Sequence, residues 1–184
     1  MGNLGDGGAW VLLVTVGVGL GAVMPSGRAR AAETDVAAAG VRNRIECPMT
    51  RPMLDRAAEG ALRRLQSPEC GRIFSDFKDR AGRTLAERLE AIDETGASYL
   101  ANRMWFFDGS GARACQDSST VFVTKPGSAV VFVCARQLRT LAFHDPVVVE
   151  VLLIHEELHS LGLGENPPST DEITSQVQRR CGTR

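Results

Sequence analysis

The sequence is poor in aromatic residues, in net charge and in histidine. Aromatic residues make up 5% of its 184 residues, and 21 Lys and Arg nearly balance 22 Asp and Glu, which gives a formal net charge of −1. A protein without an overall basic charge and with few aromatic side chains lacks the usual means of binding nucleic acid, so we expect no nucleic-acid partner. Five cysteines are too few for a small scaffold held together by disulfides alone. The chain has three histidines, so a pattern among them is informative.

Long hydrophobic runs are also missing, with one exception. Residues 9–23 read AWVLLVTVGVGLGAV, an apolar run of 15 residues. A membrane-spanning helix needs about 20 residues, whereas a run of this length is typical of a signal peptide. Ala29, Arg30 and Ala31 then supply a small-x-small pattern for signal peptidase. We therefore predict a signal peptide at residues 1–31 and an exported protein, periplasmic or secreted, without stable membrane insertion after cleavage; an uncleaved N-terminal anchor is the alternative.

All five cysteines follow that segment, at Cys47, Cys70, Cys115, Cys134 and Cys181. Because export leads to an oxidising compartment, we expect two disulfide bonds and one remaining thiol. Spacing alone leaves the pairing open. The pair Cys115 and Cys134 is favoured, because these residues flank a predicted β-hairpin.

Mixed helix and strand patterns predict an α+β fold. Residues 32–46 begin with a loose, Ala-rich stretch and are predicted to be a flexible segment before one domain at 47–184. The segment 99–107 is ambiguous and is assigned to a strand. Helical periodicity, N-cap residues and capping boxes predict helices over Pro52–Leu65 and Cys70–Phe74, from Thr84 to near Ile92, and from Ser169 towards Cys181.

Stronger patterns follow in the second half of the chain. Ser119–Thr124 and Ala129–Cys134 are rich in β-branched and aromatic residues, and the Lys-Pro-Gly-Ser segment between them indicates a hairpin turn. An Asp-Pro pair then opens a helix that runs from Val147 to about Leu161. Because apolar residues surround most of its circumference, we expect this helix to be buried at the centre of the domain.

The end of that helix contains the motif His155-Glu156-Glu157-Leu158-His159, an HExxH sequence. Residues four apart lie one turn apart on the same face of a helix, so both imidazoles can bind one metal ion. Two imidazoles suit zinc, and a catalytic zinc site usually has three protein ligands and a water. Glu156 falls at the edge of that face, where it can hold and deprotonate the water without binding the metal.

The wider segment from His155 to Glu165, HEELHSLGLGE, resembles the zincin metallopeptidases and matches the metzincin spacing HExxHxxGxxH/D. In that family the glycine, here Gly162, lets the chain turn so that a third ligand reaches the metal, and the resemblance puts Glu165 at this position. The tail is also similar to exported bacterial proteins regarded as zinc peptidases. The resemblance implies a small zincin-like α+β domain, in which a β-hairpin or sheet packs on the buried HExxH helix, with one Zn²⁺ per chain.

Alternatives to Glu165 remain open. In gluzincins the third ligand is a Glu on a later helix, and Glu172 is the matching candidate here. Glu172 also completes a capping box with Ser169, which would give its carboxylate a structural role. Asp171 is a further candidate. A carboxylate that does not bind the metal could instead accept the ring N–H of a ligand histidine.

Three other features bear on such a site. His144 lies about three helical turns, roughly 16 Å, from the motif, which is too far for a ligand, so we expect a loop residue. Tyr99, the only tyrosine, could stabilise an oxyanion, but core packing is the favoured interpretation. In zincins an edge strand before the active-site helix pairs with extended substrate, and Ala129–Cys134 has that place in the sequence; an ordinary internal strand is the equal alternative.

These patterns together predict an exported zinc-dependent metallopeptidase, expected to be a monomer, that acts on a peptide or protein substrate. His155, His159 and Glu165 would bind zinc, and Glu156 would be the general base for a zinc-activated water. The alternatives are a non-catalytic zinc-binding module with the same fold, and a disulfide-held exported structural domain without metal.

Overall fold

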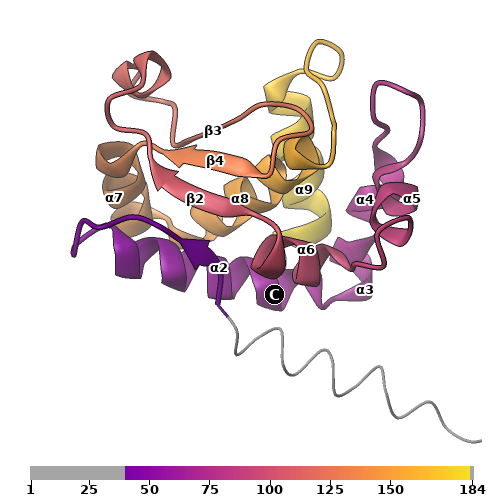
Figure 1. The fold of residues 1–184 in the computed structure, drawn as a ribbon, viewed down its shortest axis with the longest axis horizontal. Helices are drawn as coiled ribbons and strands as arrows, with labels where there is room; N and C mark the ends of the chain where they lie inside the picture. Colours follow the sequence, from indigo (N-terminus) through magenta and orange to yellow (C-terminus); the bar gives the residue numbers. More distant parts are fainter. Residues whose placement is uncertain (1–39, 183–184) are drawn as a thin grey trace, which may run out of the picture.

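The computed structural model describes residues 40–182, which form an α+β fold with a small sheet and a set of helices packed against it (Figure 1). The strands are β1 (Arg42–Asn43), β2 (Trp105–Asp108), β3 (Phe122–Thr124) and β4 (Val130–Val133). The helices are α2 (Arg51–Leu65), α3 (Pro68–Gly71), α4 (Ile73–Asp76), α5 (Leu85–Glu90), α6 (Gly96–Asn102), α7 (Ala135–His144), α8 (Pro146–Ser160) and α9 (Thr170–Cys181), with a 3₁₀ helix η1 at Arg113–Gln116. The predicted fold class is confirmed. Within this part of the chain, no helix is long and apolar enough to cross a membrane.

The strands form one mixed sheet in the order β1, β2, β4, β3. β1 and β2, and β2 and β4, pair in parallel, whereas β3 runs antiparallel to β4. The predicted hairpin is therefore present. Its second strand lies inside the sheet, between β2 and β3. Of the two alternatives for Ala129–Cys134, the internal strand is therefore confirmed and the edge strand is wrong; β3 is at the edge instead. The reason is the long-range pairing of β4 with β2, which local hairpin patterns do not reveal.

The two faces of the sheet differ because side chains alternate along each strand. Phe106, Val131 and Val133 are fully buried and belong to the same apolar core as helices α2 and α8. Their neighbours Phe107 and Phe132 are 37% and 43% exposed. One face of the sheet therefore builds the core, and the other is partly open to solvent.

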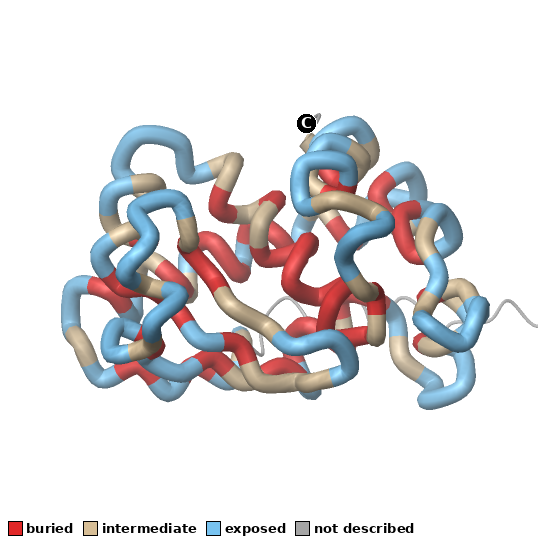
Figure 2. Tube along the Cα trace, turned by 90° about the horizontal axis from the view of Figure 1, so that it is seen from above, coloured by how far each residue is buried: buried red, intermediate tan, exposed pale blue. Residues whose placement is uncertain are grey.

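Helix α8 is the centre of the domain, as its apolar circumference predicted. It packs against α2, α7, α9 and strand β3, and every residue of 153–160 is buried. Pro146 and the side chain of Asp145, which accepts a hydrogen bond from the N–H of Val148, begin the helix where the sequence predicted. In Figure 2 the buried segments occupy the middle of the molecule and exposed loops surround them.

Most predicted helix starts are confirmed. The capping boxes at Thr84 and Ser169 begin α5 and α9, and α2 contains the predicted segment Pro52–Leu65. Ser67 caps α3 by accepting a hydrogen bond from the N–H of Cys70. The single helix expected over Cys70–Phe74 is instead two short ones, α3 and α4.

Two segments differ from the prediction. The segment 99–107, assigned to a strand, begins within helix α6, and only its end forms β2. Thr95 and Ser98 form the capping box that starts α6, but a serine replaces the glutamate or glutamine of the usual pattern. Helix α7 was not predicted, and His144 is its last residue. The expectation that His144 is a loop residue is therefore wrong.

Two disulfide bonds join Cys70 to Cys181 and Cys115 to Cys134, and Cys47 is the remaining thiol. Both the predicted number of bonds and the favoured pair are confirmed. The first bond attaches the last helix, α9, to α3, which lies 111 residues earlier in the sequence. It therefore fixes the helix that follows the HExxH segment to the first half of the domain.

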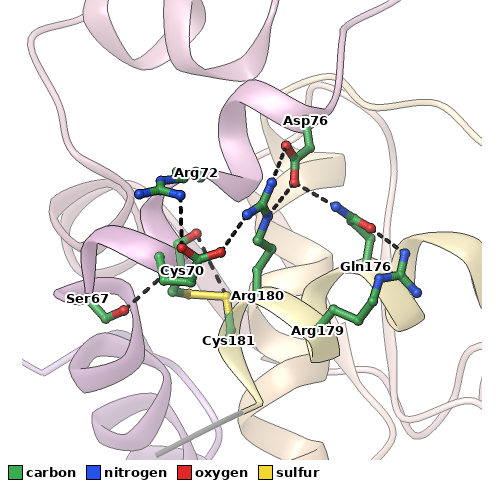
Figure 3. A network of polar contacts seen from close by, with 9 residues as sticks. Ser67, Cys70, Arg72, Asp76, Gln176, Arg179, Arg180 and Cys181 are labelled. Carbon is green, nitrogen blue, oxygen red and sulfur yellow. Dashed lines mark hydrogen bonds and ion pairs between the residues drawn. A yellow bond between two sulfur atoms is a disulfide. The ribbon is translucent and has the colours of Figure 1, made fainter.

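Arg180, next to this disulfide, adds ion pairs to the same connection (Figure 3). Its guanidinium donates hydrogen bonds of 2.8 and 3.0 Å to the two carboxylate oxygens of Asp76, and it also contacts Glu69. Gln176 donates a further hydrogen bond to Asp76. The bond from Arg180 is the main reason why the pKa values of Asp76 and Glu69 lie below their usual range.

The domain begins earlier in the chain than the sequence suggested. Strand β1 is part of the sheet, and Ile45 is fully buried in the core, although the sequence predicted a flexible segment over 32–46. The signal peptide predicted at residues 1–31 lies outside the described residues and stays a prediction.

Candidate metal centre

The HExxH motif lies in the second half of α8, where it is almost completely removed from solvent. His155, Glu156 and His159 are 3%, 7% and 5% exposed. The spacing of four residues puts both histidines on one face of the helix. Their Nε2 atoms are 2.9 Å apart, so the two rings point at the same space.

The other nitrogen of each ring is held from outside the motif. Nδ1 of His159 lies 2.9 Å from the carbonyl oxygen of Leu163; a carbonyl only accepts hydrogen bonds, so this nitrogen carries the proton. Nδ1 of His155 lies 3.0 Å from the hydroxyl of Thr174 on helix α9. Nε2 of His159 is then the ring nitrogen that faces the site, as in a metal-binding histidine. Burial, together with the neighbouring His159, lowers the pKa of His155 to about 3, so its ring is neutral.

The chain reverses direction directly after α8. Gly162 has a φ of +110°, a conformation that favours glycine. Its N–H donates to the carbonyl of His159, and the N–H of Leu163 donates to that of Leu158. This pair of bonds is the Schellman motif that ends many helices. The sharp turn expected at Gly162 is present, and it directs the following residues back towards the motif.

That turn brings a carboxylate to the histidines. Oε1 of Glu165 lies 3.2 Å from Nε2 of His159, and ligand atoms of His155, His159 and Glu165 all lie within 4.8 Å of one another. The hydroxyl of Thr170 donates a hydrogen bond of 2.8 Å to the same oxygen of Glu165 and orients the carboxylate. The structure therefore brings together the three residues that the sequence proposed as metal ligands.

This set of ligand atoms fits zinc. One class of catalytic zinc site uses two imidazoles and a carboxylate and leaves a fourth position open. Zn–N bonds of about 2.1 Å in tetrahedral geometry separate two ligand nitrogens by about 3.4 Å. The 2.9 Å between Nε2 of His155 and Nε2 of His159 is close to this value, so a small movement of the rings admits an ion.

Glu172, the alternative third ligand, has another role. Its carboxylate accepts hydrogen bonds from the backbone N–H and the hydroxyl of Ser169, at 2.8 and 2.9 Å, and so caps helix α9. These bonds lower the pKa of Glu172. Neither Glu172 nor Asp171 belongs to the group of possible metal ligands found among residues 40–182.

Glu156 lines the cleft at the metal centre, close to Thr124 of β3. Burial raises the pKa of its carboxyl to about 7; the Thr124 hydroxyl acts in the opposite direction, and the charge of Glu165 adds to the rise. Glu156 is not one of the three grouped ligands. A carboxyl that lines the cleft beside the ligands is in position to exchange a proton with a bound molecule.

The cleft has a volume of about 560 Å³, which is typical of ligand-binding sites. The chain from Ser119 to Thr124, which includes edge strand β3, lines one part of it, together with Pro126 in the hairpin turn. The N–H of Gly127 in this turn donates a hydrogen bond of 2.8 Å to the carbonyl of His159. The hairpin is thus attached to α8 at one of the candidate metal ligands.

Glu157, the second glutamate of the motif, lies in the core. It is fully buried, and neither of its carboxylate oxygens has a hydrogen-bond partner among the described residues. Helix α6 passes close by: a Cβ added at Gly96 would lie 3.3 Å from Oε1 of Glu157. Burial raises the pKa of Glu157 well above its usual value. This side chain therefore belongs to the core and lies outside the candidate metal site.

Two further residues considered from the sequence lie outside the centre. Tyr99 is 8% exposed, its hydroxyl lies 2.9 Å from Oγ of Ser160, and burial raises its pKa. The favoured interpretation of Tyr99 as a core residue is confirmed. His144 does not belong to the group of possible metal ligands in the described chain.

Thr174 and Arg80 were missed by the sequence analysis. Thr174 contacts His155 only because α8 and α9 pack together, and no motif marks a single threonine on a helix. Arg80 comes from the loop between α4 and α5 and lines the cleft. Both contacts depend on tertiary packing between segments far apart in the sequence.

Comparison with known proteins adds no family. No protein-family model matches the chain, and no curated protein or solved structure matches it with significance.

Proposed function

We propose that this protein is an exported zinc-dependent peptidase. The observation that carries the proposal is the convergence of His155, His159 and Glu165, with their ligand atoms within 4.8 Å, at a cleft that Glu156 also lines. Three ligands of these types leave one position free, as catalytic zinc sites do. The resemblance of the motif to that of the zincins supports the same conclusion.

Zinc, when bound, would supply Lewis acidity, which lowers the pKa of water and polarises a carbonyl group. The other roles belong to the chain. The carbonyl of Leu163 and the hydroxyl of Thr174 hold the histidine rings in orientation, and Thr170 holds the carboxylate of Glu165. Glu156 accepts a proton from the attacking water and passes it to the leaving amine.

The position of strand β3 is consistent with a peptide substrate. The strand is one of the two edge strands of the sheet formed by the described residues, and it lines the cleft. The N–H of Cys134 donates to the carbonyl of Val121, and hydrogen-bonded pairs alternate along an antiparallel ladder. The backbone groups of Phe122 and Thr124 therefore point away from β4, where they can pair with an extended peptide.

The substitution Glu156→Gln tests this proposal. The amide keeps the size of the side chain but cannot accept the proton, so kcat should fall by at least about a hundredfold. Zinc content, measured on the same samples, should not change. Glu90→Gln, on the exposed side of α5, is the matched control and should keep full activity. The measurement is the cleavage of internally quenched peptides. The proposal would be contradicted if Glu156→Gln cleaved them at the normal rate, or if the wild-type protein did not cleave them at all.

The two disulfides are typical of an oxidising compartment, which supports export. They also favour a second candidate function, a disulfide-held structural domain that binds no metal. This candidate predicts that the purified protein holds no zinc and that His155→Ala leaves its stability unchanged. Metal content therefore separates the two candidates.

A further inference from the structure

Arg80 lies in a short loop whose shape is fixed by its neighbour Asp79. The carboxylate of Asp79 accepts hydrogen bonds of 2.9 and 3.0 Å from the N–H groups of Ala81 and Arg83, and it also pairs with the guanidinium of Arg83. A bridge between Lys78 and Thr84 closes the loop. Asp79 is thus engaged within the loop, and Arg80 projects from an ordered piece of chain.

The side chain of Arg80 reaches the segment that carries the third metal ligand. Its Nε would lie 3.3 Å from a Cβ added at Gly164, the residue before Glu165. A side chain at position 164 would crowd the guanidinium, so the glycine permits this approach. Arg80 also lines the cleft with His155, Glu156 and Glu165.

No carboxylate of residues 40–182 forms an ion pair with Arg80. Six other arginines of this part of the chain do have such pairs: Arg64, Arg72, Arg83, Arg88, Arg103 and Arg180. Arg80 is exposed, and it is the one Lys or Arg among the described residues that line the cleft. Its charge is therefore available to a bound molecule.

We infer that Arg80 selects substrates that carry a carboxylate near the bond to be cleaved. The inference rests on the proposed peptidase function and names the substrate class. A guanidinium binds a carboxylate through two parallel N–H···O bonds, which makes arginine well suited to this recognition. In a peptide the carboxylate is either an Asp or Glu side chain or the free C-terminus. Arg80 is a specificity residue here and takes no part in the proton transfers.

Internally quenched peptides in matched pairs test the inference. One set differs only by Glu or Gln near the cleaved bond, and a second set differs only by a free or an amidated C-terminus. A hydrogen bond between charged groups is stronger than one between neutral groups. We therefore expect the wild-type protein to prefer the charged member of one set by about tenfold to a hundredfold in kcat/KM. The set that shows the preference identifies the source of the carboxylate.

Substitutions at Arg80 complete the test. The ratio of kcat/KM for the charged and the neutral peptide should fall to about one in Arg80→Gln and should be partly kept in Arg80→Lys. In Arg80→Glu the protein should instead prefer peptides that contain Lys. Arg136 is an exposed arginine on α7 that lines a different cavity, so Arg136→Gln is the control and should keep the preference for the charged peptide. Equal cleavage of both members by the wild type, or a preference that survives Arg80→Gln, overturns the inference and leaves the peptidase proposal standing. If the wild-type protein cleaves no peptide of either set, the peptidase proposal fails and the inference fails with it.

Discussion

The backbone N–H of Gly127 donates a hydrogen bond of 2.8 Å to the carbonyl oxygen of His159. The same carbonyl accepts a hydrogen bond from the N–H of Gly162. One backbone group of a candidate metal ligand is thus bound both to the hairpin turn before β4 and to the turn that leads to Glu165. The positions of the edge strand and of the third ligand are therefore set relative to the same residue.

We predict that Gly127→Ala destabilises the domain. Gly127 has a φ of +81°, where an alanine is strained by about 1 kcal/mol, and this lowers Tm by roughly 3 °C. Gly111→Ala is the matched control, because a Cβ meets no atom within 4 Å at either position and Gly111 does not have a positive φ. Calorimetry of both variants gives the comparison. Equal Tm values for the two would show that the conformation of the turn is not important.

The hydroxyl of Thr174 is expected to support metal binding through His155. Thr174→Val keeps the shape of the side chain but removes the contact to Nδ1, and such losses typically weaken zinc binding about tenfold to a hundredfold. Competition with a chelator measures the zinc Kd. Thr140→Val, whose hydroxyl bonds only within helix α7, is the control and should not change it. An unchanged zinc Kd for Thr174→Val would show that the hydroxyl of Thr174 is not needed to orient the imidazole of His155.

The buried carboxyl of Glu157 leads to a prediction of increased stability. An unpartnered polar group in the core costs about 1 to 3 kcal/mol, so Glu157→Met should raise the free energy of unfolding in urea by a similar amount. Glu90→Met, at an exposed position, should change it by less than about 0.5 kcal/mol. A loss of stability in Glu157→Met would mean that the carboxyl makes a favourable contact in the folded protein.

Stability should also depend on pH through Asp76. Its pKa is lower in the folded protein, mainly because of the bond from Arg180, with Gln176 and Arg179 also facing it. Its ionised form therefore stabilises the fold above about pH 4, the value of a free Asp, and this contribution is lost as pH falls through the lower folded pKa. Urea midpoints of the wild type and Asp76→Asn should differ at pH 6, and the difference should shrink as the pH falls below about 4. A difference that is the same at all pH values would contradict this explanation.

Local patterns predicted those features that depend on near neighbours in the sequence. The cap at Asp145, the capping box at Ser169 and the turn at Gly162 each need only a few adjacent residues, and all three are present. The HExxH spacing likewise needs one helical turn.

Features that depend on tertiary pairing were missed or misplaced. The edge position of β3 follows from the parallel pairing of β2 with β4, between segments more than twenty residues apart. The contact of Thr174 with His155 and the approach of Arg80 to Gly164 arise only when distant segments pack together. The segment 99–107 was assigned to a strand, although its first residues, from Tyr99 on, belong to helix α6.

Zinc content is the most direct test of the metal centre. We expect the purified protein to contain about one zinc per chain. Glu165→Ala should lose most of this zinc, because Glu165 lies 3.2 Å from Nε2 of His159. Glu172→Ala should keep it, because the carboxylate of Glu172 is bound to Ser169. A protein that holds no zinc even after refolding with excess metal, or that loses it only in Glu172→Ala, would contradict the account.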